Sequence, residues 1–486
     1  MDSIIPLAHP LPLCFIYKFM LHTDITSIIR DAFEAGEPTD DQIVAMEKLG
    51  RFLGENRDSM MVLKGSAGTG KTSLISALTR TLPAIQMKYV LMAPTGRAAK
   101  VMQQYSDIPA QTIHRHIYVT RSSGSGFSFE LKYNRTKNTL YIVDEASMLG
   151  VDDGFSQQSL LHDLLEFVMS GHNNRILLVG DHAQLPPVGQ EESPALDEAY
   201  LRSAFSLSFD TIYLNQVVRQ AQESTILRNA TILRNMIENE NIALPKLETG
   251  KDVIRITDGT ESQEAFESAF YNPLEMESVV LLRSNKRANL YNKELRARIM
   301  WKEEELCAGD LLMNNKNNYF WLDEKASAGF IANGDLLEVI RPGKESFMYG
   351  HRFRHATLRL VDYPDQPGFE AILMLDTLTE ETPALSKAKQ QAFLQALADE
   401  EPHLSKGQFW AKVKKNPFFN ALQVKFAYAI TTHKSQGGQW RHVFIEQPWL
   451  PDGEIKLSDL RWLYTAMTRA TEKVYLLGFG EAYFEG

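Results

Sequence analysis

A glycine-rich stretch near the start of the chain constrains its fold more than any other feature. Residues 65–72 read Gly-Ser-Ala-Gly-Thr-Gly-Lys-Thr, which fits the phosphate-binding pattern G-x-x-x-x-G-K-[ST]. An apolar run, Met60–Leu63, precedes the stretch, and apolar spacing predicts a helix over Ser73–Leu82. In such a strand–loop–helix setting, backbone N–H groups converge on phosphates at a helix N-terminus. The pattern therefore predicts a nucleotide site within an α/β domain.

Two side chains of this loop have defined chemistry. Lys71 is expected to pair with the β- and γ-phosphates of ATP, and the hydroxyl of Thr72 is expected to bind Mg²⁺. A glycine-rich turn with a chance lysine is the alternative, and the full spacing and flanks argue against it. The other loop residues are expected to contact ATP, and they are Gly65, Ser66, Ala67, Gly68, Thr69 and Gly70.

Composition limits the class of protein. A chain of 486 residues is expected to form roughly two to four domains. The 44% apolar share is that of a soluble globular protein. Cys14 and Cys307 are too few for a disulfide scaffold or a four-cysteine zinc site, and they fit a reducing, cytoplasmic setting. The net charge of -10 argues against general electrostatic capture of nucleic acid, but it leaves room for a local basic groove.

The first residues form a predicted tail. Ile4–Leu21 is rich in apolar residues but contains three prolines, which exclude a regular membrane-spanning helix. Asp2 stands where a basic region would begin, and no small-residue cleavage site follows, so a secretory signal is not expected. We expect the functional start near Met20 and no interaction with a membrane.

Two parts of the chain alternate predicted strands with predicted helices. Each strand is a short apolar run, as buried parallel strands require, and those of the first part end in polar clusters. Open α/β sheets bind ligands at that edge. The pattern predicts two doubly wound parallel-sheet domains. The strand candidates are Met60–Leu63, Tyr89–Met92, Leu140–Val143 and Ile176–Val179 in the first part, and Val279–Leu282, Val424–Ala429, Val443–Ile445 and Val474–Leu477 in the second.

Changes in this pattern divide the chain. The second α/β pattern is interrupted by a stretch that is first strand-like and then polar and helical, which predicts a small β-rich insertion. The predicted divisions are a tail at residues 1–22, a first α/β domain at 23–213, a second α/β domain at 214–335 and 420–486, and the β-rich insertion at 336–419.

The first α/β domain contains a smaller insertion within residues 117–138. A run of serine and glycine precedes Phe127 and Phe129, which alternate with polar residues. This arrangement predicts a projecting β-hairpin. A flexible surface loop is the alternative on the same evidence.

Acidic and amide side chains follow two of the predicted strands. Asp144 and Glu145 come after Leu140–Val143, where Asp144 is suited to hold Mg²⁺ and Glu145 to activate the attacking water as general base. Gln184 follows a later strand and is suited to sense the γ-phosphate or orient that water. Taken alone, an acidic pair at a strand end is often a solvated loop, so the interpretation depends on the phosphate-binding loop.

The order of these motifs resembles that of superfamily one nucleic-acid helicases, closest to the RecD and Dda type. The resemblance runs from about Gln42 to about Leu477. It implies two RecA-like doubly wound parallel-sheet domains, with the β-hairpin inserted in the first and a small barrel-like domain inserted in the second. The segments that carry it are Gln42, Gly65–Thr72, Ala93–Ala99, Thr112–His114, Asp144–Glu145, Gly180–Val188, Leu214–Gln220, Thr431–Gly437 and Tyr464–Ala470.

The resemblance implies further contacts to ATP. Gln42 matches the glutamine that contacts adenine, Arg219 matches a γ-phosphate contact, and Arg469 matches the arginine finger. Gly437 lies in a motif that touches both nucleotide and strand. Arginine suits these roles because its planar, permanently charged fork reaches phosphate oxygens in pairs. Outside such a motif an arginine is usually an exposed salt-bridging residue.

The resemblance also implies contacts to a single strand from both α/β domains, mostly through its backbone. Phe127 or Phe129 at the hairpin is expected to act as the pin that separates strands by stacking on the base pair at the fork. A histidine on its own is more often structural than DNA-binding. The expected strand-binding residues are Pro94, Thr95, Arg97, His114, Lys286, Thr432 and His433.

The implied function is that of an ATP- and Mg²⁺-dependent DNA helicase that moves 5′ to 3′ on single-stranded DNA. Its expected partners are single-stranded DNA and fork duplex, with repair or replication proteins as further candidates, and a monomer is expected. One alternative is a translocase that does not separate strands or that acts on RNA. Another is a P-loop kinase or switch ATPase that binds no nucleic acid, but this alternative leaves the second α/β domain unexplained.

Overall fold

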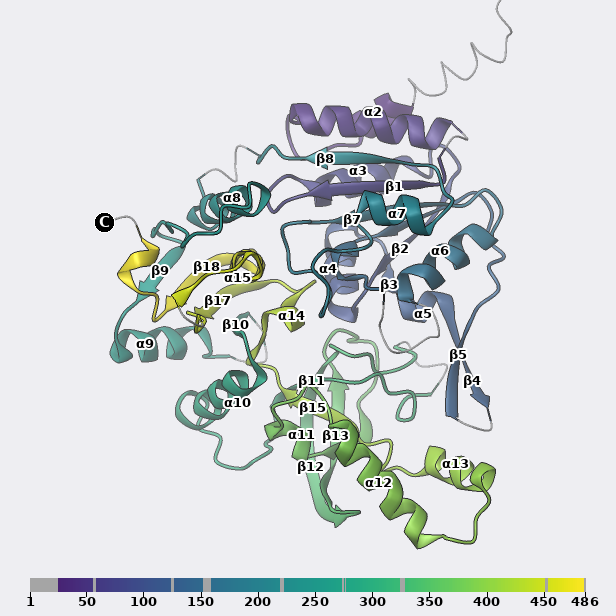
Figure 1. Ribbon diagram of the computed structural model, residues 1–486, viewed down its shortest axis with the longest axis vertical. Coiled ribbons are helices and arrows are strands. Elements are labelled where there is room, and N and C mark those ends of the chain that lie inside the picture. Colours follow the sequence, from purple (N-terminus) through teal and green to yellow (C-terminus); the bar gives the residue numbers. More distant parts are fainter. Residues whose placement is uncertain are drawn as a thin grey trace, which may run out of the picture.

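The computed structural model describes residues 25–484, except for residues 56–57, 124–125, 152–158, 219–222, 273–274, 276, 324–327 and 451–452. Figure 1 shows three parts: a first lobe at the top right, a second lobe at the left, and a barrel below them. The predicted tail at residues 1–22 lies outside the described residues. Among the residues described, none of the helices combines the length and the apolar character needed to span a bilayer.

The first lobe is a parallel sheet of six strands in the order β3-β2-β6-β7-β1-β8. Residues of β1 alternate between the two faces: Met61 and Leu63 join one core cluster, whereas Met60 and Val62 join the other. Both faces of the sheet are therefore apolar, as its continuous apolar strands require. The strands are β1 (Met60–Gly65), β2 (Lys88–Ala93), β3 (Ala110–Thr112), β6 (Thr139–Val143), β7 (Arg175–Gly180) and β8 (Phe209–Leu214).

Helices cover both faces of this sheet. One face packs against the helices α2, α3 and α4, and the other packs against α5, α6 and α7 (Figure 1). The six helices are α2 (Asp40–Gly54), α3 (Lys71–Thr81), α4 (Gly96–Ser106), α5 (Ile113–Ile117), α6 (Leu160–Ser170) and α7 (Glu198–Ala204).

The predicted β-hairpin is present. Strands β4 (Tyr118–Ser123) and β5 (Gly126–Leu131) pair antiparallel in a continuous register from Tyr118–Leu131 to Ser123–Gly126. The hairpin lies below the first lobe, and β5 lies near α13 (Lys406–Lys415), a helix beside the barrel (Figure 1).

The second lobe is a parallel sheet of five strands in the order β16-β10-β17-β18-β9. On β17, Val443 and Ile445 pack with α8 and α15, whereas Phe444 faces α9 and α10. The strands are β9 (Val253–Ile256), β10 (Ser278–Leu282), β16 (Ala429–Thr431), β17 (Trp440–Glu446) and β18 (Ala470–Leu477), and the helices are α8 (Thr225–Glu238), α9 (Gly259–Ala269), α10 (Asn285–Glu294) with a π-helical turn over Leu295–Ile299, α14 (Thr432–Ser435) and α15 (Leu457–Met467).

The third part is a closed barrel of five strands, and its interior is continuous with the core of the second lobe. Helices α12 and α13 pack on a separate apolar face through Phe393, Leu397 and Val413. The elements are β11 (Leu311–Asn314), β12 (Leu336–Met348), β13 (His351–Leu360), β14 (Phe369–Met374), β15 (Leu422–Phe426), α11 (Asp376–Thr379), α12 (Lys387–Glu400) and α13 (Lys406–Lys415).

These observations confirm the predicted fold class and correct two details. The predicted insertion at 336–419 omits β11 and β15, which close the barrel. The predicted strand Val424–Ala429 is two strands in two different sheets, because the chain leaves the barrel after β15 and joins the second lobe at β16. Tyr428 sits at the crossing, where its carbonyl accepts from Val280 N–H and its hydroxyl from Leu311 N–H.

Candidate active site

A cavity of about 590 Å³ lies between the two lobes, at the C-terminal edge of the first sheet and at the N-terminal ends of β17 and β18 in the second. From the first lobe it is lined by the phosphate-binding loop and by the residues that follow β6 and β7. Gln439, Thr468, Arg469 and Ala470 line it from the second lobe. The sequence-predicted residues that meet here are Ser66, Ala67, Gly68, Gly70, Lys71, Thr72, Asp144, Glu145, Gln184 and Arg469.

The phosphate-binding loop has the conformation that its glycines allow. Gly68 and Gly70 have φ angles of 76° and 82°, in the left-handed region that glycine favours. A Cβ on Gly70 would also collide with Nε2 of Gln42. The Lys71 ammonium donates to the carbonyls of Gly65 and Ser66 at 2.7 and 2.9 Å, so its charge lies at the loop that starts α3. This geometry suits a bound phosphate.

Gln42 contacts the loop from α2. Its side chain accepts from the N–H of Thr39 in a capping box, and its Nε2 donates to the carbonyl of Thr69 at 3.0 Å. The residue is 2% exposed. Its place beside the loop is compatible with the predicted adenine contact, which stays a prediction.

The acidic pair follows β6 as predicted. Asp144 accepts a hydrogen bond from the hydroxyl of Tyr105 at 2.6 Å, and from the N–H of Glu145 at 2.8 Å. Glu145 has a φ of 53°, unusual for a residue with a side chain, and such strain collects at functional sites. Burial raises the pKa of Glu145, and the charge of Arg469 opposes that rise. A carboxylate with a raised pKa is suited to accept a proton from water.

Arg469 reaches the acidic pair from the second lobe. It lies just beyond α15, is 4% exposed, and its Nη1 is 3.7 Å from Oε1 of Glu145. Its Nε donates to the carbonyl of Thr465, which holds the guanidinium against its own helix. The cavity therefore has cationic groups from both lobes, Lys71 and Arg469. Arg219 lies outside the described residues.

Two observations bear on the ligands that the cavity fits. Oε1 of Gln184 is buried at the cavity and has no hydrogen-bond partner in the described part of the chain, so it is open to a ligand or water. The hydroxyl of Thr72 and the carboxylate of Asp144 line the same cavity, and oxygen ligands of this kind suit Mg²⁺ shared with phosphate oxygens. Within residues 25–484 as described, no group of three or more His, Cys, Asp or Glu side chains could hold a metal by itself.

Several predicted strand-binding residues lie at a second contact between the lobes. Thr95 caps α4 by accepting from the N–H of Ala98. Gly437 has a φ of 74°, and a Cβ there would be 2.6 Å from Cβ of Ala98. Arg97 lies over the ring of Trp440 at 3.9 Å and donates to the carbonyl of Gln439. Gly437 thus packs on α4 and is not among the cavity-lining residues, whereas Gln439, two residues later, is.

The other predicted strand-binding residues are more scattered. Thr432 is buried, and its hydroxyl has no hydrogen-bond partner among the described residues. Burial and the charge of Arg283 lower the pKa of the neighbouring His433. His114, on α5, lies 5.7 Å from the ring of Tyr118, and Lys286 is an exposed residue of α10 that pairs with Glu381. Only Pro94, Thr95, Arg97, Thr432 and His433 come from the two motifs on either side of the seam between lobes.

Comparisons with known proteins agree with this geometry. Residues 39–256 match the AAA domain family, and residues 426–477 match the UvrD-like helicase C-terminal domain family. The chain is 24% identical over 438 residues to the ATP-dependent DNA helicase dda of Enterobacteria phage T4, across 85% of this chain and 93% of that protein. It is 21% identical over 476 residues to the RecBCD enzyme subunit RecD of Buchnera aphidicola, across 88% of this chain and 72% of that protein.

The chain is thus similar to helicases of the RecD and Dda type along most of its length. The ATP-dependent RecD2 DNA helicase of Deinococcus radiodurans is 33% identical over 174 residues, across 35% of this chain and 21% of that protein. Among solved structures, one of Pif1 helicases at forked double-stranded DNA covers 93% of this chain at 15% identity with a TM-score of 0.46.

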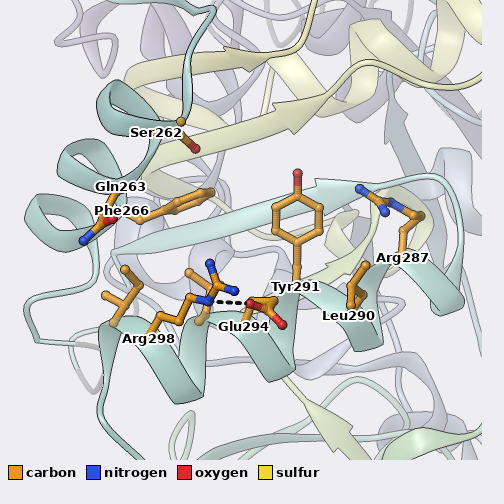
Figure 2. Close-up of a pocket in the computed structure, with 11 residues that line it drawn as sticks. Ser262, Gln263, Phe266, Arg287, Leu290, Tyr291, Glu294 and Arg298 are labelled. Atoms are coloured by element: carbon orange, nitrogen blue, oxygen red, sulfur yellow. Dashed lines mark ion pairs between the residues drawn. The ribbon is translucent and has the colours of Figure 1, made fainter.

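A second cavity, of about 310 Å³, lies on the outside of the second lobe between α9 and α10 (Figure 2). Phe266 and Tyr291 face each other across it with their ring centroids 6.3 Å apart. Its arginines already have carboxylate partners, because Arg298 pairs with Glu294 and Arg287 pairs with Glu446, which lies on β17. None of the predicted nucleotide- or strand-binding residues lines this cavity, so the candidate active site is the one between the lobes.

One group near the strand-binding motifs was missed by the sequence analysis. Asp335 of the barrel is buried at the first residue of α4, where a Cβ on Gly96 would collide with its Oδ1. Oδ2 accepts from the N–H of Ala332 at 2.7 Å, but Oδ1 has no partner among the described residues. Burial raises the pKa of Asp335 to about 8, and the charge of Asp362 adds to the rise. The sequence indicates only a turn at Asn333-Gly334-Asp335. It does not reveal the contact with Gly96, because the two segments are far apart in the chain.

The raised pKa of Asp335 predicts how stability depends on pH. The folded chain keeps this proton up to about pH 8, whereas the unfolded chain releases it near the ordinary value of 3.8. The stability that this proton contributes to the folded state is fully present below pH 3.8. It is lost as pH rises from there towards 8, by about 1.4 kcal/mol per pH unit. Asp335→Asn carries no such proton, so its melting temperature relative to wild type should rise between pH 5 and pH 8.

Melting curves at several pH values measure this difference. The control is Asp365→Asn, which alters an exposed carboxylate in the loop before β14 and should give a difference that does not change with pH. A pH-independent difference for Asp335→Asn as well would contradict the prediction.

Proposed function

We propose that this chain is an ATP-dependent DNA helicase that moves 5′ to 3′ along single-stranded DNA and hydrolyses ATP between its two lobes. The observation that carries the proposal is the cavity lined from both lobes, with Lys71 and Glu145 on one side and Arg469 on the other. An arginine supplied across a cleft ties the chemistry to the closure of that cleft. Similarity to helicases of the RecD and Dda type over most of the chain supports the same function.

The residues predicted for the nucleotide site have the following roles in this proposal. Lys71 and the N–H groups of the loop bind the phosphates, and Arg469 stabilises charge on the transferred phosphoryl group. Glu145 accepts the proton of the attacking water, which Gln184 orients. Thr72 and Asp144 would hold Mg²⁺, which neutralises phosphate charge when bound. Gln42 would contact adenine, and Arg219 would contact the γ-phosphate.

The strand lies across both lobes in this proposal. Pro94, Thr95 and Arg97 belong to the first lobe, and Thr432 and His433 belong to the second, so both sets lie beside the seam that ATP closes. Contacts of this kind position the backbone and carry little sequence information. If the lobes close and open with each ATP turnover, the strand is gripped alternately by the two sets and advances. We also propose that the protein acts as a cytoplasmic monomer on fork duplex, in repair or replication.

Hydrolysis should depend on the two cationic groups of the cavity. Lys71→Ala should nearly abolish ATPase activity, and Arg469→Ala should lower kcat roughly a thousandfold or more, as for other arginine fingers. Arg441→Ala is the matched control, because Arg441 is an exposed arginine of the same lobe that pairs with Glu277 and Glu472. Steady-state ATPase assays with single-stranded DNA measure these effects, and retained hydrolysis in either cavity variant would count against the proposal.

The direction of movement is tested with duplexes that carry one single-stranded tail. Wild type should unwind the duplex with a 5′ tail and leave the duplex with a 3′ tail intact, and Lys71→Ala should unwind neither. Unwinding of only the 3′-tailed duplex would reverse the assigned direction. Stronger ATPase stimulation by single-stranded RNA than by DNA would favour an RNA-directed translocase instead.

The hairpin of β4 and β5 is proposed as the strand-separating pin. Replacing both Phe127 and Phe129 with Ala should depress unwinding severalfold, because an aromatic ring that stacks on the fork base pair is lost. ATPase stimulation by single-stranded DNA should stay near wild type, since that activity needs no fork. Val119→Ala, on β4 of the same hairpin, is the control. Equal loss of both activities in the double variant would show that the hairpin has another role.

A further inference from the structure

A tyrosine of the second lobe contacts the phosphate-binding loop of the first. The hydroxyl of Tyr464, on α15, accepts a hydrogen bond from the N–H of Ala67 at 2.9 Å. The same hydroxyl donates to Oδ2 of Asp181 at 2.6 Å. Tyr464 and Asp181 are each 1% exposed. Three segments far apart in the sequence therefore meet at one oxygen atom.

The hydroxyl of Tyr464 keeps its proton in this place. Burial, and then the charge of Asp181, raise the pKa of Tyr464 well above its ordinary value. The hydroxyl can therefore donate its proton in the hydrogen bond to Asp181, while its oxygen accepts the hydrogen bond from the N–H of Ala67. The other carboxylate oxygen of Asp181 accepts from the N–H of Ala183 at 3.0 Å, so the carboxylate is fixed on both sides.

Asp181 begins a connector, residues 181–185, that the second lobe holds at three points. Besides the bond to Tyr464, the N–H of Leu185 donates to the hydroxyl of Thr465 at 2.9 Å, and Nε2 of Gln436 donates to the carbonyl of Leu185 at 2.7 Å. Ala183 and Leu185 pack in the core cluster of the second lobe. The connector belongs to the first lobe by sequence and to the second lobe by packing.

The connector includes Gln184, whose unpartnered Oε1 lies at the nucleotide cavity. The N–H of Gln184 donates to the carbonyl of Asp181, so a shift of Asp181 moves Gln184. At the other end, Ala67 lines the same cavity, and N–H groups of such loops are the groups that bind phosphate. Tyr464 thus stands between a group that detects phosphate and a group placed to orient water.

We infer that Tyr464 is a positioning residue that couples phosphate in the loop, through Asp181, to the placement of Gln184. The inference rests on the proposed function, and it adds a residue of the second lobe that acts without touching the nucleotide. Because Tyr464 lies in the last turn of α15 and Arg469 just beyond that helix, closure of the lobes positions both groups together. When a phosphate accepts a hydrogen bond from the N–H of Ala67, the bond from this N–H to the Tyr464 hydroxyl is weakened. The hydroxyl can then move together with Asp181.

A second side chain of the second lobe reaches the same half of the loop. Arg234, on α8, donates to Oγ of Ser66 at 2.6 Å and to the carbonyl of Asn215 at 3.1 Å. Loss of the Tyr464 hydroxyl alone therefore leaves the loop held by Arg234. For this reason the Tyr464→Phe variant should still bind nucleotide.

The test separates positioning from binding. In Tyr464→Phe, kcat for ATP should fall about tenfold, equivalent to about 1.4 kcal/mol, while KM for ATP and the Kd for ADP change less than about twofold. Tyr475→Phe is the matched control, because Tyr475 is a largely buried tyrosine of β18 whose ring stacks on Phe444. Its hydroxyl has no hydrogen-bond partner among the described residues, so its kcat should equal that of wild type.

Two results would overturn the inference. One is a kcat for Tyr464→Phe within about twofold of Tyr475→Phe, and the other is a raised KM with an unchanged kcat, which would mark a role in binding only. If Tyr464→Phe does not fold, Asp181→Asn is the second variant, because it alters the carboxylate that accepts the hydrogen bond from Tyr464. It should give the same drop in kcat at constant KM. If no nucleic acid stimulates the wild-type ATPase activity, the proposed function is wrong. The comparison of kcat values between Tyr464→Phe and Tyr475→Phe still tests the role of Tyr464 in that case.

Discussion

The bond from the N–H of Ala67 to the hydroxyl of Tyr464 joins the two lobes at the wall of the nucleotide cavity. Together with the approach of Arg469 to Glu145, it means that neither lobe has a complete site alone. The first lobe supplies the loop and the acidic pair, and the second supplies the arginine and the hydroxyl. A site divided in this way can be assembled or taken apart by a small relative movement of two rigid sheets.

The same seam carries the residues expected to hold the strand. The guanidinium of Arg97 lies on Trp440, and Gly437 packs directly on Ala98 of α4. The residues expected to contact nucleotide and strand therefore lie along one boundary, so a movement that shifts one set shifts the other. The barrel reaches this boundary as well, through Asp335 at the start of α4. The Oδ1 atom of Asp335 is buried beside the first residue of α4 and has no hydrogen-bond partner among the described residues.

The sequence predicted the elements that have local signatures. The glycines and Lys71 of the loop, the acidic pair after β6 and the apolar strands could all be identified, because each depends on a short run of residues. Prediction failed where the signal was not local. Val424–Ala429 has one continuous apolar pattern, yet its two halves lie in different sheets, since alternation of side chains does not reveal which strand is the neighbour.

The sequence by itself determined that this chain has a phosphate-binding loop, two parallel-sheet domains and a set of motifs in the order of superfamily one helicases. Only the tertiary structure decided that Tyr105 bonds to Asp144, that Tyr464 bonds to Ala67 and Asp181, and that Asp335 is buried at α4. The reason is physical: a tyrosine or aspartate has the same local signature whether its polar atom meets water or a distant segment. Burial and partner, which set its chemistry, arise when the lobes and the barrel pack together.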